Sequence, residues 1–88
     1  MVERSVQIMN KLGLHARPAA EIVKTSGKFT SEITILRDGM EVNAKSIMGV
    51  MMLAAECGST IVLRADGGDA DAALDALTAL IQNKFGER

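Results

Sequence analysis

The chain contains no tryptophan or tyrosine, and its only aromatic residues are Phe29 and Phe85. It carries 10 basic and 11 acidic side chains, so its formal net charge is −1. Surfaces that bind nucleic acids are usually strongly basic and often stack bases on aromatic rings. The composition therefore argues against a nucleic-acid partner.

Cysteine and histidine are as scarce as aromatic residues, with Cys57 and His15 the single representatives. One cysteine cannot form an internal disulfide, and these two residues offer too few ligands for most zinc sites. The longest uncharged apolar stretch runs from Ile47 to Ala55, well short of the ~20 residues that cross a bilayer. We therefore expect no metal, no other cofactor, no membrane insertion and a reducing, cytoplasmic location.

Apolar periodicity predicts four strands and three helices. The strands are expected at residues 2–8, 32–36, 40–43 and 60–65, and the first two helices at 16–26 and 46–55. Gly27 lies where a helix-ending glycine is expected, and Asp38-Gly39 suits a tight hairpin turn. Asp69 is expected to cap the last helix. That helix should bury one stripe of side chains: Ala70, Ala73, Leu74, Leu77 and Ile81.

The order of these elements, β-α-β-β-α-β-α, predicts the fold class. A chain of 88 residues buries only about two thirds of its unfolded surface, so it cannot cover both faces of a four-stranded sheet. We predict a single two-layer α+β domain over residues 1–88, with the helices on one face of the sheet and the other face open to water.

His15 lies where the loop after the first strand meets the first helix. It would precede that helix, with Ala16 and Arg17 as its first residues and Pro18 in its first turn. The first N–H groups of a helix have no internal partner and attract anions. A phosphoryl group on the imidazole of His15 could bind the backbone N–H groups of Ala16 and Arg17 and the Arg17 guanidinium. The spacing is compatible with a phosphohistidine site but does not by itself select it.

Three other interpretations fit these residues. His15 could be a weak helix cap beside a solvated Arg17. The chain could be a small acyl-phosphate hydrolase in which Arg17 holds the phosphate and Asn10 orients water. It could also be a regulatory module that binds a metabolite on its sheet. A hydrolase would turn over without partner proteins, and a metabolite-binding module would not need His15.

The second predicted helix is apolar on most of its surface. A domain of this size can bury only one side of such a helix, so Ile47, Met48 and Met51 are expected to form an exposed apolar patch. The alternative is that these side chains pack into the core. Ser46 is expected to be the N-cap, and a phosphate there would place negative charge beside the patch.

Two segments resemble one known family. Gly-Leu-His-Ala-Arg-Pro-Ala at 13–19 is similar to the active-site signature of HPr, the histidine-containing phosphocarrier of the bacterial phosphoenolpyruvate-dependent phosphotransferase system. Asn-Ala-Lys-Ser-Ile-Met-Gly-Val-Met at 43–51 resembles that family's regulatory-serine segment. Both lie at the family's usual positions, so the resemblance covers the whole chain. It implies an open-faced β-sandwich with strand order 1-4-2-3 and three helices on one face.

The resemblance also implies a function. Phosphorylated enzyme I would phosphorylate Nδ1 of His15 with help from Arg17, and the IIA components of sugar transporters would receive the group. The chain would act as a carrier and not as an enzyme by itself. A serine kinase and phosphatase could act on Ser46. We expect a monomer that docks partners through six residues: Ala20, Lys24, Lys45, Ile47, Met48 and Met51. Whether the final acceptor belongs to sugar transport or to a nitrogen-linked branch stays open.

Overall fold

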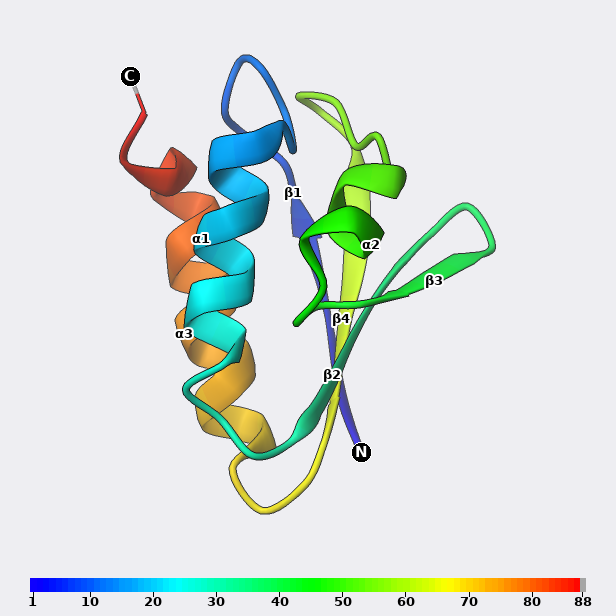
Figure 1. Cartoon of the computed structure of the whole chain (residues 1–88), viewed down its shortest axis with the longest axis vertical. Coiled ribbons are helices and arrows are strands. Elements are labelled where there is room, and N and C mark those ends of the chain that lie inside the picture. Colours follow the sequence, from blue (N-terminus) through cyan, green and yellow to red (C-terminus); the bar gives the residue numbers. More distant parts are fainter. Residues whose placement is uncertain (88) are drawn as a thin grey trace.

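The computed structural model describes residues 1–87 and contains one sheet covered by helices on one side (Figure 1). The strands are β1 (Val2–Gln7), β2 (Glu32–Arg37), β3 (Met40–Asn43) and β4 (Thr60–Asp66). The helices are α1 (Ala16–Ser26), α2 (Ile47–Met52) and α3 (Ala70–Gln82), followed by a 3₁₀ turn at Lys84–Gly86. Neighbouring strands pair antiparallel in the order β1-β4-β2-β3. The predicted fold class and strand order are confirmed.

The two faces of the sheet follow from the alternation of residues along the strands. In β4, Ile61, Leu63 and Ala65 are buried toward the helices, while the residues between them face the other way. On that open face, Arg64 contacts Glu3 at 2.7 Å and Glu41 at 3.5 Å. One face therefore carries the core, and the other carries charged side chains.

The helical layer supplies the other half of the core. All five residues of the predicted α3 stripe are buried: Ala70, Ala73, Leu74, Leu77 and Ile81. The turn between β2 and β3 also agrees with prediction, since Asp38 and Gly39 have φ angles of 48° and 81°. In the part of the chain that the structure describes, no helix is long and apolar enough to span a membrane.

The second helix is shorter than predicted, ending at Met52 instead of residue 55. The backbone N–H of Leu53 donates to the carbonyl of Val50, and that of Ala54 donates to the carbonyl of Met51. Each bond joins residues three apart in the chain, whereas α-helical bonds join residues four apart. Ala54 then takes a left-handed φ of 48°, which stops the helix. This turn lets Leu53 and Ala55 enter the core, an effect that helical periodicity does not reveal.

Gly27 and Asp69 are the cap residues of α1 and α3, as predicted, but neither caps its helix in the expected way. Gly27 has an ordinary right-handed φ of −64°. The N–H groups of Lys28 and Phe29 bond to carbonyls three residues earlier, so the chain leaves α1 through tight turns without a left-handed residue. Asp69 precedes α3 but makes no capping hydrogen bond within that helix. Its carboxylate instead accepts hydrogen bonds from Thr30 and Ser31, just before β2. Asp69 is therefore the N-cap residue by position, as predicted, but its side chain does not cap the helix because a tertiary contact takes it.

Candidate functional site

The loop between β1 and α1 presents His15 at the surface. Gly13 has a φ of +67°, and an added Cβ would collide with the carbonyl oxygen of Ala55. Leu14 is buried, and its backbone N–H donates to that same carbonyl at 2.9 Å. The loop is thereby attached to the core, and His15 follows as the predicted N-cap residue of α1, with 36% of its side chain exposed.

The backbone around His15 has the features that the sequence predicted for an anion site. The first hydrogen bond of α1 runs from the N–H of Ala19 to the carbonyl of His15, at 3.0 Å. The N–H groups of Ala16 and Arg17 come before this bond and have no partner within the helix. Pro18 has no N–H, so its burial in the first turn leaves no donor unsatisfied. The structure therefore brings His15, Ala16 and Arg17 together at the start of α1.

Glu87 completes this site, although the sequence analysis did not single it out. Its Oε2 lies 2.9 Å from Nε2 of His15 and accepts a hydrogen bond from the Arg17 guanidinium at 3.2 Å. Its Oε1 accepts a hydrogen bond from the amide of Asn10 at 3.0 Å. Only 15% of the Glu87 side chain is exposed. Glu87 lies 72 residues from His15, and no local pattern in the sequence indicates their contact.

The electrostatics of Glu87 follow from these donors. The hydrogen bond from Asn10 lowers the pKa of the Glu87 carboxyl below its usual value, and the bonds from His15 and Arg17 act in the same direction. Partial burial opposes the shift without cancelling it. Glu87 is therefore a carboxylate at neutral pH.

Asn10 is buried behind the loop and does not face solvent. Its amide nitrogen donates to the carbonyl of Gly13 at 2.8 Å as well as to Glu87. Its amide oxygen has no hydrogen-bond partner among residues 1–87. The hydrolase interpretation needs Asn10 to orient an attacking water, and a residue that is 1% exposed does not meet that requirement.

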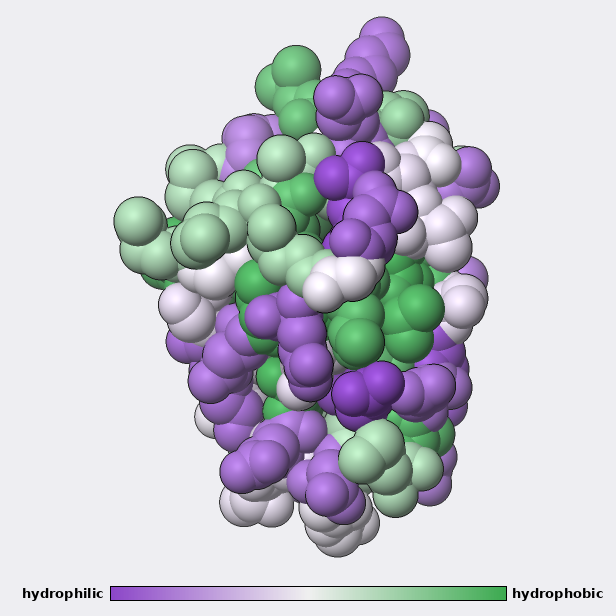
Figure 2. Space-filling model, turned by 90° about the vertical axis from the view of Figure 1, so that its right-hand side faces the viewer, coloured by the Kyte–Doolittle hydropathy of each residue, from purple (hydrophilic) through white to green (hydrophobic). Residues whose placement is uncertain are grey.

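The start of α2 carries the predicted serine cap and apolar patch. Oγ of Ser46 accepts a hydrogen bond from the backbone N–H of Gly49 at 3.1 Å, so Ser46 is the N-cap. The exposed large apolar side chains of this helix form what we call the α2 patch: Ile47, Met48, Met51 and Met52. Figure 2 faces this side of the molecule and shows hydrophobic side chains gathered in its upper part, where α2 lies. The helices α1 and α2 are in contact, so the patch and the His15 site belong to neighbouring elements.

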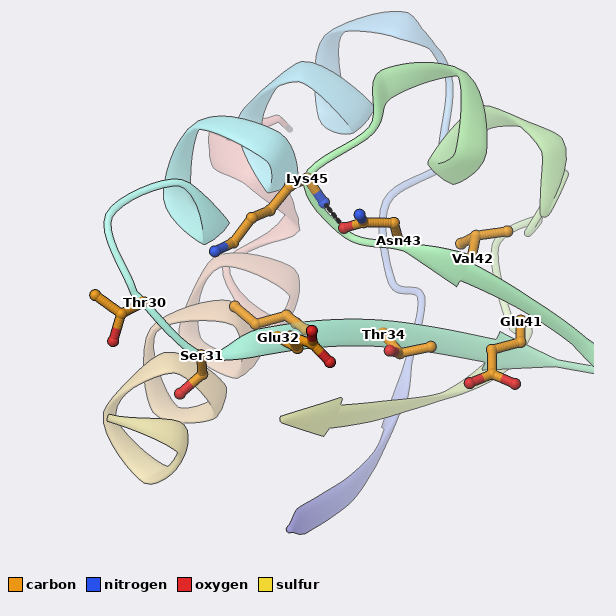
Figure 3. A pocket seen from close by; sticks show the side chains of 9 residues that line it. Thr30, Ser31, Glu32, Thr34, Glu41, Val42, Asn43 and Lys45 are labelled. Carbon is orange, nitrogen blue, oxygen red and sulfur yellow. Dashed lines mark hydrogen bonds between the residues drawn. The ribbon is translucent and has the colours of Figure 1, made fainter. Parts of the chain in front are cut away.

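The predicted basic docking residues lie in different environments. Lys24 is exposed on α1, as is Ala20 one turn earlier. Lys45 is half-buried, and its ammonium group donates to the carbonyl of Phe29 at 2.8 Å. A hollow of about 380 Å³ lies beside β2 and β3. Figure 3 shows Lys45 on one side of this hollow and Glu32 below it. None of the residues that line this hollow belongs to the His15 site.

Among the described residues, no three His, Cys, Asp or Glu side chains are placed to hold a metal ion.

This chain is similar to known proteins over nearly its whole length. Residues 2–83 match the family described as PTS-HPr, PTS HPr component phosphorylation site. The phosphocarrier protein HPr of Cupriavidus necator is 55% identical over 99% of this chain and 98% of its own length. The phosphocarrier protein NPr of Shewanella violacea is 48% identical over 98% of this chain and 94% of its own length.

A solved structure shows the same fold. The crystal structure of HPr-C-His from Thermoanaerobacter tengcongensis superposes with a TM-score of 0.96 at 50% identity, covering 100% of this chain and 99% of that one. The family match and these identities extend over nearly the whole chain and include the loop, α1 and α2. The chain therefore belongs to the HPr family, the phosphocarrier proteins of the phosphotransferase system.

Proposed function

We propose that His15 is the phosphoryl-carrying residue of this chain. Its Nδ1 accepts the group from phosphorylated enzyme I and passes it to IIA components. The observation that carries the proposal is the exposed imidazole of His15 at the start of α1, beside the Arg17 guanidinium, in a member of the HPr family. By this proposal the chain is a carrier, and its partners supply the catalysis.

The physical basis is a modest stabilisation of the bound phosphoryl group. Its oxygens accept hydrogen bonds from the N–H groups of Ala16 and Arg17, and the guanidinium adds a charge-assisted bond. The helix dipole contributes about 0.3–2 kcal/mol at such a position. The covalent nitrogen–phosphorus bond holds the group on His15, and a stabilisation this modest leaves the group available to the next acceptor.

Docking of partner proteins is proposed for the α2 patch and its surroundings. Exposed methionines adapt to differently shaped partners because their side chains are unbranched and flexible. The proposed docking residues remain Ala20, Lys24, Lys45, Ile47, Met48 and Met51. Reversible phosphorylation of Ser46 by a kinase and phosphatase would place negative charge at the edge of this surface.

The proposed assembly state is a monomer with a cytoplasmic location. One related structure is described as an HPr dimer from Thermoanaerobacter tengcongensis, and this chain covers 100% of that protein. The mass of this chain in solution, measured by light scattering, tests the proposal, and a dimer would contradict it.

Labelling of a His15→Ala variant tests the carrier function. Wild-type chain incubated with enzyme I and radiolabelled phosphoenolpyruvate should gain one phosphoryl group, labile in acid and stable in alkali. The His15→Ala variant should lose essentially all of this label because the accepting nitrogen is absent. Ser46→Ala is the matched control and should be labelled like wild type. Unchanged labelling of His15→Ala would reject the proposal.

A further inference from the structure

The last described residues fold back onto the start of α1 in an unusual backbone conformation. Lys84, Phe85 and Gly86 have left-handed φ angles of 55°, 55° and 75°. Residues with a Cβ adopt such angles only where their surroundings hold them there. Here the Phe85 side chain is buried in the core, and the turn that it stabilises brings Glu87 to His15.

The contact between Glu87 and His15 determines which ring nitrogen carries a hydrogen. An ionised carboxylate can only accept hydrogen bonds, so the 2.9 Å contact requires Nε2 of His15 to be the donor. In a neutral imidazole, a hydrogen on Nε2 leaves the lone pair on Nδ1. The ring makes no capping hydrogen bond with α1, and Glu87 is its only hydrogen-bond partner among residues 1–87.

We infer that Glu87 is a positioning residue that holds His15 in its Nε2–H form and thereby presents the Nδ1 lone pair to the phosphoryl donor. The inference rests on the proposed carrier function of His15. It adds a role for a side chain 72 residues away from the histidine. Glu87 orients the imidazole and does not itself touch the transferred group.

The proton stays in place throughout the proposed transfer. When the Nδ1 lone pair bonds to phosphorus, the nitrogen–phosphorus bond of the donor phosphohistidine breaks and its electron pair stays with the donor. The ring of His15 then bears positive charge, which the carboxylate of Glu87 stabilises through the Nε2–H bond. On delivery, the nitrogen–phosphorus electron pair returns to Nδ1, and Nε2 keeps its hydrogen. No proton has to enter or leave the ring.

A purely structural role for Glu87 would predict different behaviour. Glu87 also receives hydrogen bonds from Asn10 and Arg17, so its removal affects the local structure in any case. Packing alone does not select between the two neutral forms of an imidazole, whereas a carboxylate at Nε2 does. The distribution between these forms is therefore the property that distinguishes the two roles.

The test reads the two forms of His15 by long-range ¹H–¹⁵N NMR of the ring, in the unphosphorylated chain at a pH where the ring is neutral. Wild type should hold the Nε2–H form. Glu87→Ala, and the more shape-preserving Glu87→Met, should raise the share of the Nδ1–H form about tenfold. The rate of phosphorylation by enzyme I should fall about tenfold, with the label still on His15, chiefly because the carboxylate no longer stabilises the positive charge of the phosphorylated ring.

The control is Glu32→Ala, which removes an exposed carboxylate from β2 and should leave the forms as in wild type. Equal distributions in wild type and both Glu87 variants would overturn the inference, as would a wild type that is mainly Nδ1–H. A wild type that is mainly Nδ1–H overturns the inference even if neither variant folds. This measurement uses no partner protein, so labelling of His15→Ala tests the carrier function separately.

Discussion

At the scale of single residues, the placement of His15 depends on Gly13. The chain turns at Gly13 with a φ of +67° and passes so close to residues 55 and 56 that no side chain fits there. This close approach lets Leu14 bond to Ala55 and leaves His15 at the start of α1. Gly13 thus acts on the site through the backbone, without touching the imidazole.

A Gly13→Ala variant should be less stable than wild type. The left-handed conformation alone costs about 1–2 kcal/mol for a residue with a Cβ. The collision with Ala55 adds to this cost because a backbone carbonyl cannot move as easily as a side chain. Urea unfolding measures the difference. Gly39→Ala is the matched control, since Gly39 shares a positive φ of +81° but has nothing within 4 Å of an added Cβ. Equal losses in the two variants would show that the collision is unimportant.

At the scale of elements, α2 combines a weak helix with an exposed apolar surface. It has only six residues and includes Gly49, a poor helix former. The hydrogen bond from Gly49 to Ser46 is therefore a substantial part of what holds its first turn. The position that starts the helix is also the position where a phosphate would change the charge of the α2 patch.

Substitutions of Ser46 should separate these two roles. Ser46→Asp should keep the melting temperature nearly unchanged, since aspartate also caps helices, and should slow transfer from enzyme I through its charge. Ser46→Ala should lose about 1 kcal/mol of stability by removing the cap while transferring at the wild-type rate. Thermal melting and phosphorylation rates check both. A wild-type transfer rate in Ser46→Asp would contradict the docking surface.

At the scale of the whole molecule, Asp69 connects two distant parts of the chain. Its carboxylate accepts hydrogen bonds from the side chain and backbone of Ser31 and from the backbone of Thr30, which join the start of α3 to the residues just before β2. The Ser31 hydroxyl is the largest cause that lowers the pKa of Asp69 to about 2, followed by the Thr30 N–H. The ionised carboxylate is thus the form that the fold stabilises.

The lowered pKa of Asp69 makes the stability of the fold depend on pH. The folded pKa of about 2 lies below the ordinary aspartate pKa of 3.8, so the contribution of Asp69 to stability is complete above about pH 4 and is lost as pH falls through about 2. Asp69→Asn should lower the melting temperature at pH 7 by about 5 °C or more and reduce the further loss between pH 4 and 2. Asp66→Asn, an exposed carboxyl across the same turn, is the control for loss of charge. An unchanged acid profile in Asp69→Asn would contradict this account.

The sequence alone could predict the features that depend on residues close together in the chain. Alternation along the strands and the apolar stripe of α3 record which side of each element faces the core, so the layers and the open face were predictable. The positions of His15 and Ser46 at helix starts were predictable for the same reason, because capping depends on a few adjacent residues. The resemblance to the HPr family added the strand order, which periodicity does not contain.

The residues that meet across long distances in the chain depend on how the elements pack. The Asp69 side chain bonds to Thr30 and Ser31, which lie 39 and 38 positions earlier in the chain, instead of capping its own helix. Glu87 likewise contacts His15, 72 positions away. The end of α2 was likewise set by the burial of Leu53 and Ala55. Local sequence patterns record the exposure of each residue within its own element, whereas the partner of a side chain depends on how separate elements pack together. Local patterns therefore specify the layers and the start of the site, whereas the packing of separate elements places Glu87 against the imidazole.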